Sequence, residues 1–214
     1  MIDALRAEPA VVGLILSGSQ ARGTAGPHSD HDVIAVVRER VSLPAGSLDL
    51  AVLTVDELAD VSDIWQRYAY RDAVVLLDRL DGRIAELVRA QGTLAPSEVD
   101  GFVREHLDGY VNFVYRAAKS RRDGHADLAR LDEIEAASWF LWTLFALYGR
   151  VRPYNKYLRW ELARYPLPDP WTADRLIGAM TDQPSALFGD LERLARDRGY
   201  DDVLDDWNDL SLLR

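Results

Sequence analysis

The spacing of apolar residues changes near residue 94, and this change limits the folds that are open to the chain. Before it, short apolar runs rich in β-branched residues alternate with turn residues, as in a small sheet. After it, apolar residues recur every three or four positions, as on helices that pack together. The sequence therefore predicts an α+β protein with a small mixed-sheet domain at residues 1–94 and an α-helical bundle domain at residues 95–214.

Individual strands and helices can be predicted in both domains. Strands are expected over residues 11–16, 33–37, 48–54 and 73–77, and helices over 55–59, 64–71 and 84–90. In the second domain, Ser97 is the predicted cap of a long helix, with Asp100 three residues later. Further helices are expected over residues 126–148 (ending at Gly149), 157–165, 173–180 and 185–198.

The overall composition is that of a soluble globular protein, with 48% hydrophobic and 28% charged residues. The chain has no cysteine, which excludes disulfides, thiolate catalysis and zinc–thiolate sites. Its first residues include acids and lack the apolar core of a signal peptide, and its most apolar stretch, residues 136–148, is too short to cross a bilayer. We therefore expect a cytoplasmic protein with no membrane partner.

The net charge of −10 is spread over both domains and bears on the choice of partner. Such a surface repels a phosphate backbone, so we expect no nucleic-acid partner. Cationic small molecules would be attracted instead. The oligomeric state stays open, and a homodimer is compatible with the sequence.

The segment between the first two predicted strands contains a candidate phosphate-binding loop. A buried strand ends at Leu16, and Gly18 and Ser19 then open a short helix. Glycine lets a phosphate approach the backbone, and the first amides of a helix bind anions. The Ser19 hydroxyl adds one more donor. An ordinary helix cap is the alternative interpretation of this pair taken alone.

Three aspartates form a candidate metal site. Asp30 and Asp32 lie two residues apart at the start of a strand, so both side chains project from one face. Adjacent like charges repel unless a cation lies between them, and oxygen-only ligands suit Mg²⁺. Asp49 interrupts an otherwise apolar strand, and the three carboxylates converge if this strand pairs with that of Asp32. The alternatives are a solvated turn for the first two and an exposed position before the strand for Asp49.

Taken together, these residues resemble the DNA polymerase β-like nucleotidyltransferase superfamily. The matching motifs are Gly18-Ser19, Ala21-Arg22-Gly23, Ser29-Asp30 and Asp32, and Asp49 falls where the third carboxylate is expected. The resemblance covers about residues 10–80. The helical second part is similar, more loosely, to small antibiotic nucleotidyltransferases of the kanamycin and lincosamide types.

The resemblance implies Mg²⁺-dependent transfer of a nucleoside monophosphate from a nucleoside triphosphate, with ATP expected, to a hydroxyl of a small molecule such as an aminoglycoside-like cation. Gly18 and Ser19 would hold the β- and γ-phosphates. Asp30 and Asp32 would bridge two magnesium ions, and Asp49 would hold the second ion with the acceptor hydroxyl. Arg22 either touches the triphosphate or only braces the loop, and both interpretations stay open.

Two residues of the second domain are further candidates. Glu135 lies on an apolar stripe of a predicted helix, where a carboxylate has a raised pKa or a partner, and it is the predicted general base. The alternative is a structural glutamate paired with an arginine. Lys156 follows the second long helix, in a segment that could overhang the nucleotide, and is a candidate phosphate ligand. The alternative is a surface lysine. The stripe comprises Leu128, Leu131, Glu135, Trp139 and Trp142.

Two other functions compete with small-molecule transfer. An antitoxin-like nucleotidyltransferase would act on a protein partner, but the additional helical domain argues against such a minimal module. An inactive nucleotide-binding protein is disfavoured because all three carboxylates are present.

Overall fold

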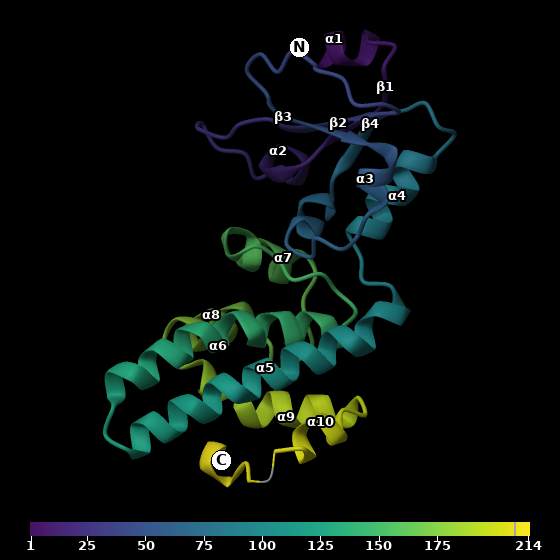
Figure 1. Cartoon of the computed structure of the whole chain (residues 1–214). Coiled ribbons are helices and arrows are strands. Elements are labelled where there is room, and N and C mark those ends of the chain that lie inside the picture. The colour runs from purple at the N-terminus through teal and green to yellow at the C-terminus, as the bar shows by residue number, and fades with distance from the viewer. Residues whose placement is uncertain (208) are drawn as a thin grey trace. The chain divides into compact units, whose positions relative to one another are not determined.

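The computed structural model describes residues 1–207 and 209–214, and the chain divides into two compact units, residues 1–94 and 95–214 (Figure 1). The first unit contains a four-stranded sheet in the order β3-β2-β1-β4. Strand β1 is antiparallel to β2 and β4, whereas β2 and β3 are parallel. All four predicted strands are present, and their ends shift by at most one residue. They are β1 (Val11–Leu16), β2 (Asp32–Val37), β3 (Asp49–Thr54) and β4 (Val74–Asp78).

The two central strands are apolar throughout because both faces of the sheet are covered. Val12 and Ile15 of β1 pack with residues of α3 and α4 on one face, whereas Val11 and Leu14 pack with Leu5 of α1 on the other. An uninterrupted apolar run is typical of a strand buried on both sides. The helices of this unit are α1 (Ile2–Ala7), α2 (Gly18–Arg22), α3 (Val55–Ala59) and α4 (Arg83–Gln91).

The predicted helix over residues 64–71 is instead a 3₁₀ turn, η1 (Gln66–Tyr70). The buried side chain of Arg67 holds this turn against the end of α4, where its Nε atom donates to the carbonyl oxygen of Gln91 (3.0 Å) and its Nη2 atom to that of Ala90 (3.1 Å). These carbonyls lie at a helix end and lack helical partners, which explains why a buried arginine is stable there. The tight turn is thus tied to a segment more than 20 residues away, a contact that the local apolar pattern does not contain.

The second unit is helical, as predicted, and two long helices, α5 (Pro96–Arg122) and α6 (Ala126–Leu147), form its centre as an adjacent pair (Figure 1). Gly109 of α5 permits their close approach, since a Cβ atom there would lie 2.3 Å from the ring of Trp139. Among the described residues, no helix is both long and apolar enough to span a membrane. The remaining elements are η2 (Asn155–Tyr157), α7 (Leu158–Arg164), α8 (Ala173–Thr181), η3 (Pro184–Leu187), α9 (Phe188–Asp197), α10 (Asp201–Asp205) and η4 (Ser211–Leu213).

The predicted cap of the first long helix was wrong by two residues. Helix α5 begins at Pro96, and Ala95, rather than Ser97, is its N-cap residue. The Ala95 amide donates to the Glu98 carboxylate (2.7 Å), so Glu98 occupies the capping position that we assigned to Asp100. Proline favours the first helical position because its φ is preset and its missing N–H has no helical partner there.

Candidate active site

The candidate phosphate loop lies at the end of β1 and touches β2. The Ser17 amide donates to the main-chain oxygen of Asp32 (2.9 Å), which continues the pairing of the two strands. Gly18 then adopts a positive φ of +64°, and a Cβ atom on it would lie 1.8 Å from Oδ2 of Asp32. Only glycine fits here without displacing that carboxylate, both for space and for backbone conformation. Ser19 follows in α2 and is buried. The loop and the carboxylate are therefore in direct contact.

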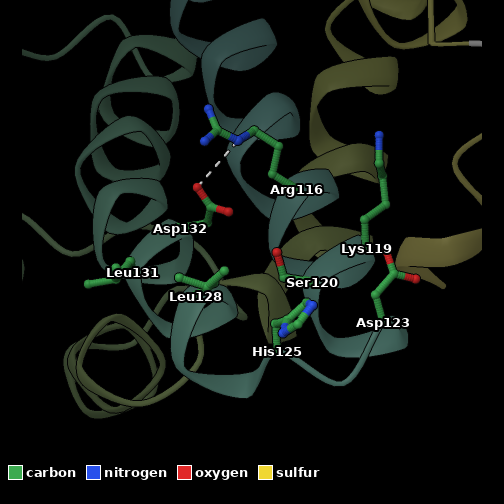
Figure 2. Close-up of a pocket in the computed structure, with 8 residues that line it drawn as sticks. All are labelled: Arg116, Lys119, Ser120, Asp123, His125, Leu128, Leu131 and Asp132. Atoms are coloured by element: carbon green, nitrogen blue, oxygen red, sulfur yellow. Dashed lines mark ion pairs between the residues drawn. The ribbon is translucent and has the colours of Figure 1, made fainter.

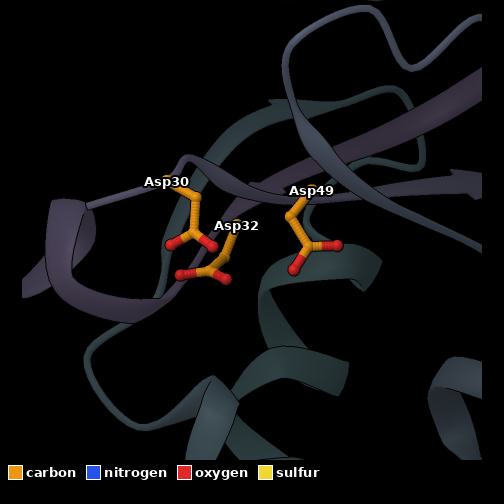
Figure 3. A group of neighbouring side chains, drawn as sticks. All are labelled: Asp30, Asp32 and Asp49. Atoms are coloured by element: carbon orange, nitrogen blue, oxygen red, sulfur yellow. The ribbon is translucent and has the colours of Figure 1, made fainter. Parts of the chain in front are cut away.

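The three predicted aspartates converge on the same edge of the sheet. Asp32 opens β2 and Asp49 opens β3, and the parallel register pairs these two residues directly. Asp30 lies two residues before the Asp32 position, in the loop that leads into β2. One carboxylate oxygen from each residue lies within 4.8 Å of the others, and Figure 3 shows the three groups turned toward one region. The expected convergence is confirmed, with one correction: Asp49 is exposed and begins its strand rather than interrupting it.

The electrostatics of this cluster favour a bound cation. Two unit charges 4.8 Å apart repel by about 1 kcal/mol in water and by about 3–4 kcal/mol at the lower effective dielectric near a protein surface. A divalent cation between the carboxylates would remove this repulsion. The donor set consists of oxygen atoms only, as Mg²⁺ prefers. Asp30 and Asp49 are exposed, so phosphate oxygens and water could complete the coordination shell.

The structure thus places a glycine-serine turn beside three carboxylates that could together hold a metal ion. A family model for the nucleotidyltransferase domain matches residues 1–111, which is all of the first unit and the larger part of α5. The chain belongs to the nucleotidyltransferase domain family. This membership is consistent with the polymerase β-like superfamily that the sequence motifs resemble. The activity of the protein is therefore of the nucleotide-transferring class. No curated protein matches the chain significantly.

Arg22 of the nucleotidyltransferase domain is 8% exposed and contacts the main chain of a distant segment. Its Nη2 atom donates to the carbonyl oxygens of Tyr68 (2.7 Å) and Arg71 (2.8 Å). Its guanidinium carbon lies 4.8 Å from the centroid of the Tyr68 ring. These contacts support the bracing interpretation of Arg22. A direct contact with the triphosphate stays a prediction.

The environment that we predicted for Glu135 was wrong. Glu135 is exposed, and its apolar neighbours Leu128 and Leu131 are 49% and 61% exposed, so this stripe does not enclose a carboxylate. Helix α6 buries a different face, and the fully buried glutamate on it is Glu133. Side chains two positions apart on a helix point about 200° apart, so Glu133 and Glu135 lie on different faces of α6. This difference explains the error. The general-base role of Glu135 thus loses its physical argument and stays an untested prediction.

Lys156 lies in η2 and is exposed. Its Nζ atom is 5.2 Å from the centroid of the neighbouring Tyr157 ring. This cation–π contact fits the alternative of a surface lysine packed on an aromatic residue. Its predicted contact with a nucleotide phosphate remains untested.

Glu133, which the sequence analysis did not single out, is the centre of a polar network in the helical unit. Its carboxylate accepts hydrogen bonds from Arg121, from the Ser185 amide (2.9 Å) and from the Ser185 hydroxyl. Burial, and to a lesser degree the charge of Glu133, raise the pKa of the Tyr110 phenol well above its usual value. The signal in the sequence was the helical period that Glu133 shares with Ala129, Ala136 and Phe140.

This network predicts a contrast between two neighbouring glutamates. Glu133→Gln should destabilise the helical unit by about 1–3 kcal/mol, because an amide cannot accept from all three donors and Arg121 loses its partner. Thermal unfolding should then begin several degrees lower. Glu135→Gln, at an exposed position of the same helix, should leave the melting temperature unchanged. Equal melting temperatures for the two variants would contradict the assignment of Glu133 as the buried partner.

A separate hollow of about 420 Å³ lies beside the turn that joins α5 to α6 (Figure 2). Its basic and acidic side chains partly compensate each other, since Arg116 pairs with Asp132 at 3.4 Å. None of the predicted catalytic, metal-binding or nucleotide-binding residues lines it. Its lining residues are Arg116, Lys119, Ser120, Asp123, His125, Leu128, Leu131 and Asp132.

Proposed function

We propose that the protein transfers a nucleoside monophosphate from a nucleoside triphosphate, with ATP as the preferred donor, to a hydroxyl group of a small molecule. The observation that carries this proposal is the cluster of Asp30, Asp32 and Asp49 in direct contact with the Gly18 turn. In the reaction, the acceptor oxygen forms a bond to the α-phosphorus. The bond from that phosphorus to the bridging oxygen breaks, pyrophosphate leaves, and the acceptor's proton passes to a base or to water.

The residues of the cluster divide this work among them. Asp30, Asp32 and Asp49 would hold Mg²⁺, which when bound supplies positive charge to the phosphates and makes the acceptor hydroxyl more acidic. Gly18, which has no side chain, leaves room for the Asp32 carboxylate beside the turn, whose backbone amides would bind the triphosphate. Ser19 would donate from its hydroxyl to a phosphate oxygen. Asp49 is exposed and so is open to the acceptor, whose hydroxyl it would orient.

The charge of the protein supports a cationic acceptor. A chain with a net charge of −10 attracts cations and concentrates them near an acidic cluster. We therefore favour an aminoglycoside-like molecule, which combines hydroxyl groups with positive charges. A cytoplasmic location belongs to the same proposal. Nucleoside triphosphates are available there, and a chain without cysteine needs no disulfide for its stability. Transfer to a protein partner is the competing function.

Pyrophosphate release measures this reaction directly. The purified protein is incubated with MgCl₂, each of the four nucleoside triphosphates in turn, and a panel of acceptors with and without amino groups. The proposal expects release that needs Mg²⁺, is fastest with ATP, increases with a cationic hydroxylated acceptor and stops with EDTA. Binding of ATP without release in the presence of every acceptor would favour an inactive nucleotide-binding protein. Labelling of a protein by radioactive ATP would favour the competing function.

Asp49→Asn separates the role of the third carboxylate from that of the other two. Because Asp49 is assigned to the acceptor side, the variant should bind MgATP with an affinity close to that of the wild type. Its maximal rate should fall by about 10²–10³-fold, as for loss of a group that acts mainly in the transition state. Calorimetric titration with MgATP and pyrophosphate release measure the two quantities. A variant that loses nucleotide affinity but keeps its rate at saturation would show that Asp49 is misassigned.

A further inference from the structure

The contacts of Arg22 tie the phosphate loop to a second segment at the same edge of the sheet. The two carbonyls that accept from Arg22 lie 46 and 49 residues further along the chain. They belong to a tight turn in which the Arg71 amide donates to the Tyr68 carbonyl (3.1 Å). Strand β4 begins directly after this turn, and its first residue, Val74, pairs with Leu16 of β1.

These contacts close a ring of chain that includes the phosphate loop. From Leu16 the chain runs through Gly18 and α2 to Arg22, crosses to the turn at residues 68–71 by hydrogen bonds, and returns through Val74 to Leu16. The turn is itself anchored, because the neighbouring Arg67 is bound to the end of α4. Arg22 therefore connects the loop to a fixed point of the domain.

Helix α2 needs such a connection. It has only five residues, and a helix of this length is not stable in isolation. Its start is attached to β2 by the Ser17 amide, but Gly18 follows immediately and imposes little conformational restraint of its own. Arg22 attaches the other end. The two attachments therefore lie at either end of the short helix that carries the Gly18 and Ser19 amides.

We propose that Arg22 is a positioning residue, which holds α2 in the orientation that binds the triphosphate before the nucleotide arrives. This inference rests on the proposed function, since the triphosphate is the ligand. The arginine fork donates to two carbonyls from one nitrogen while its plane lies over the Tyr68 ring. A lysine ammonium can also donate from one nitrogen, but it has no planar guanidinium to lie against the Tyr68 ring and its nitrogen stands on a different stem, so Arg22→Lys keeps the charge and loses this packing.

The test compares Arg22→Lys and Arg22→Gln with a matched control at the opposite end of β1. Arg79→Lys is suited to this purpose, because Arg79 also bonds to main-chain carbonyls, those of Glu8 (2.9 Å) and Val11 (2.8 Å). Amide hydrogen exchange of residues 18–22 is measured in the nucleotide-free protein. Equilibrium binding of MgATP, and KM and kcat for ATP, are measured on the same samples.

The proposal expects both Arg22 variants to exchange the amides of α2 faster than the wild type before nucleotide is added. Their Kd and KM for MgATP should rise on the order of 10–100-fold, with a smaller change in kcat. The Arg79→Lys control should change neither the exchange of α2 nor the affinity for MgATP. Loss of affinity with unchanged exchange would overturn the proposal and make Arg22 a direct phosphate ligand.

Three further results are decisive. Faster exchange with unchanged affinity would overturn the proposal, because Arg22 would then serve stability alone. Failure of both Arg22 variants to fold, when Arg79→Lys folds, would overturn it in the same way. If the wild type binds MgATP but transfers nothing to any acceptor, the proposed function fails, while exchange and binding still decide the role of Arg22.

Discussion

Asp30→Asn and Asp32→Asn should each abolish nucleotidyl transfer while the domain stays folded. Both residues belong to the cluster whose oxygens lie within 4.8 Å of one another, and each substitution removes a charged metal ligand. A bound metal stabilises the transition state by several kcal/mol. Loss of that metal should therefore lower kcat/KM on the order of 10³-fold or more. In the metal-free protein, Asp30→Asn should not lower the melting temperature, because it relieves repulsion between carboxylates.

The measurement is pyrophosphate release at several Mg²⁺ concentrations, together with thermal unfolding in EDTA. Asp3→Asn is a suitable control, since Asp3 lies in α1 with a side chain that is 93% exposed. Mg²⁺ should raise the melting temperature of the wild type and of the control. It should raise the melting temperature of the cluster variants much less. Turnover close to that of the wild type in Asp30→Asn or Asp32→Asn would rule out the metal site.

Gly18→Ala should also inactivate the enzyme, although it adds only one methyl group and removes no polar atom. The added carbon would lie 1.8 Å from Oδ2 of Asp32, so the Asp32 carboxylate must rotate out of the cluster or α2 must move away. Displacement of a catalytic group by about 1 Å can reduce the rate 10²-fold, and a similar loss is expected here in kcat/KM. The positive φ of +64° adds about 1–2 kcal/mol of backbone strain.

Gly149→Ala separates these two effects. Gly149 has the same φ of +64°, but a Cβ atom on it would meet nothing within 4 Å. This control should therefore lose a similar amount of stability and keep its activity per folded molecule. If Gly18→Ala is destabilised no more than Gly149→Ala and keeps full activity, the contact between the loop and Asp32 has no catalytic importance.

Much of the nucleotidyltransferase domain was predictable because its signals are local. Four runs of β-branched residues mark the strands, and Gly18-Ser19 and Asp30-x-Asp32 each occupy a few adjacent positions. The helical unit was harder to interpret because α6 carries apolar residues on more than one face. Its pattern therefore allows either of two faces to be buried. One choice buries Glu133, and the other places Glu135 among leucines and tryptophans. Packing against α5 and the segment around Ser185 selects the first.

The sequence by itself determined which chemical groups the protein can use: three carboxylates that can hold a metal ion, a glycine turn and no thiol. Only the tertiary structure decided where those groups meet. Asp49 lies 17 residues after Asp32 and becomes its neighbour because β2 and β3 pair in parallel. Arg22 reaches carbonyls 46 and 49 residues away because β4 pairs with β1. Strand order and register depend on the burial of whole faces of the sheet, and the pattern of any one segment does not contain that information.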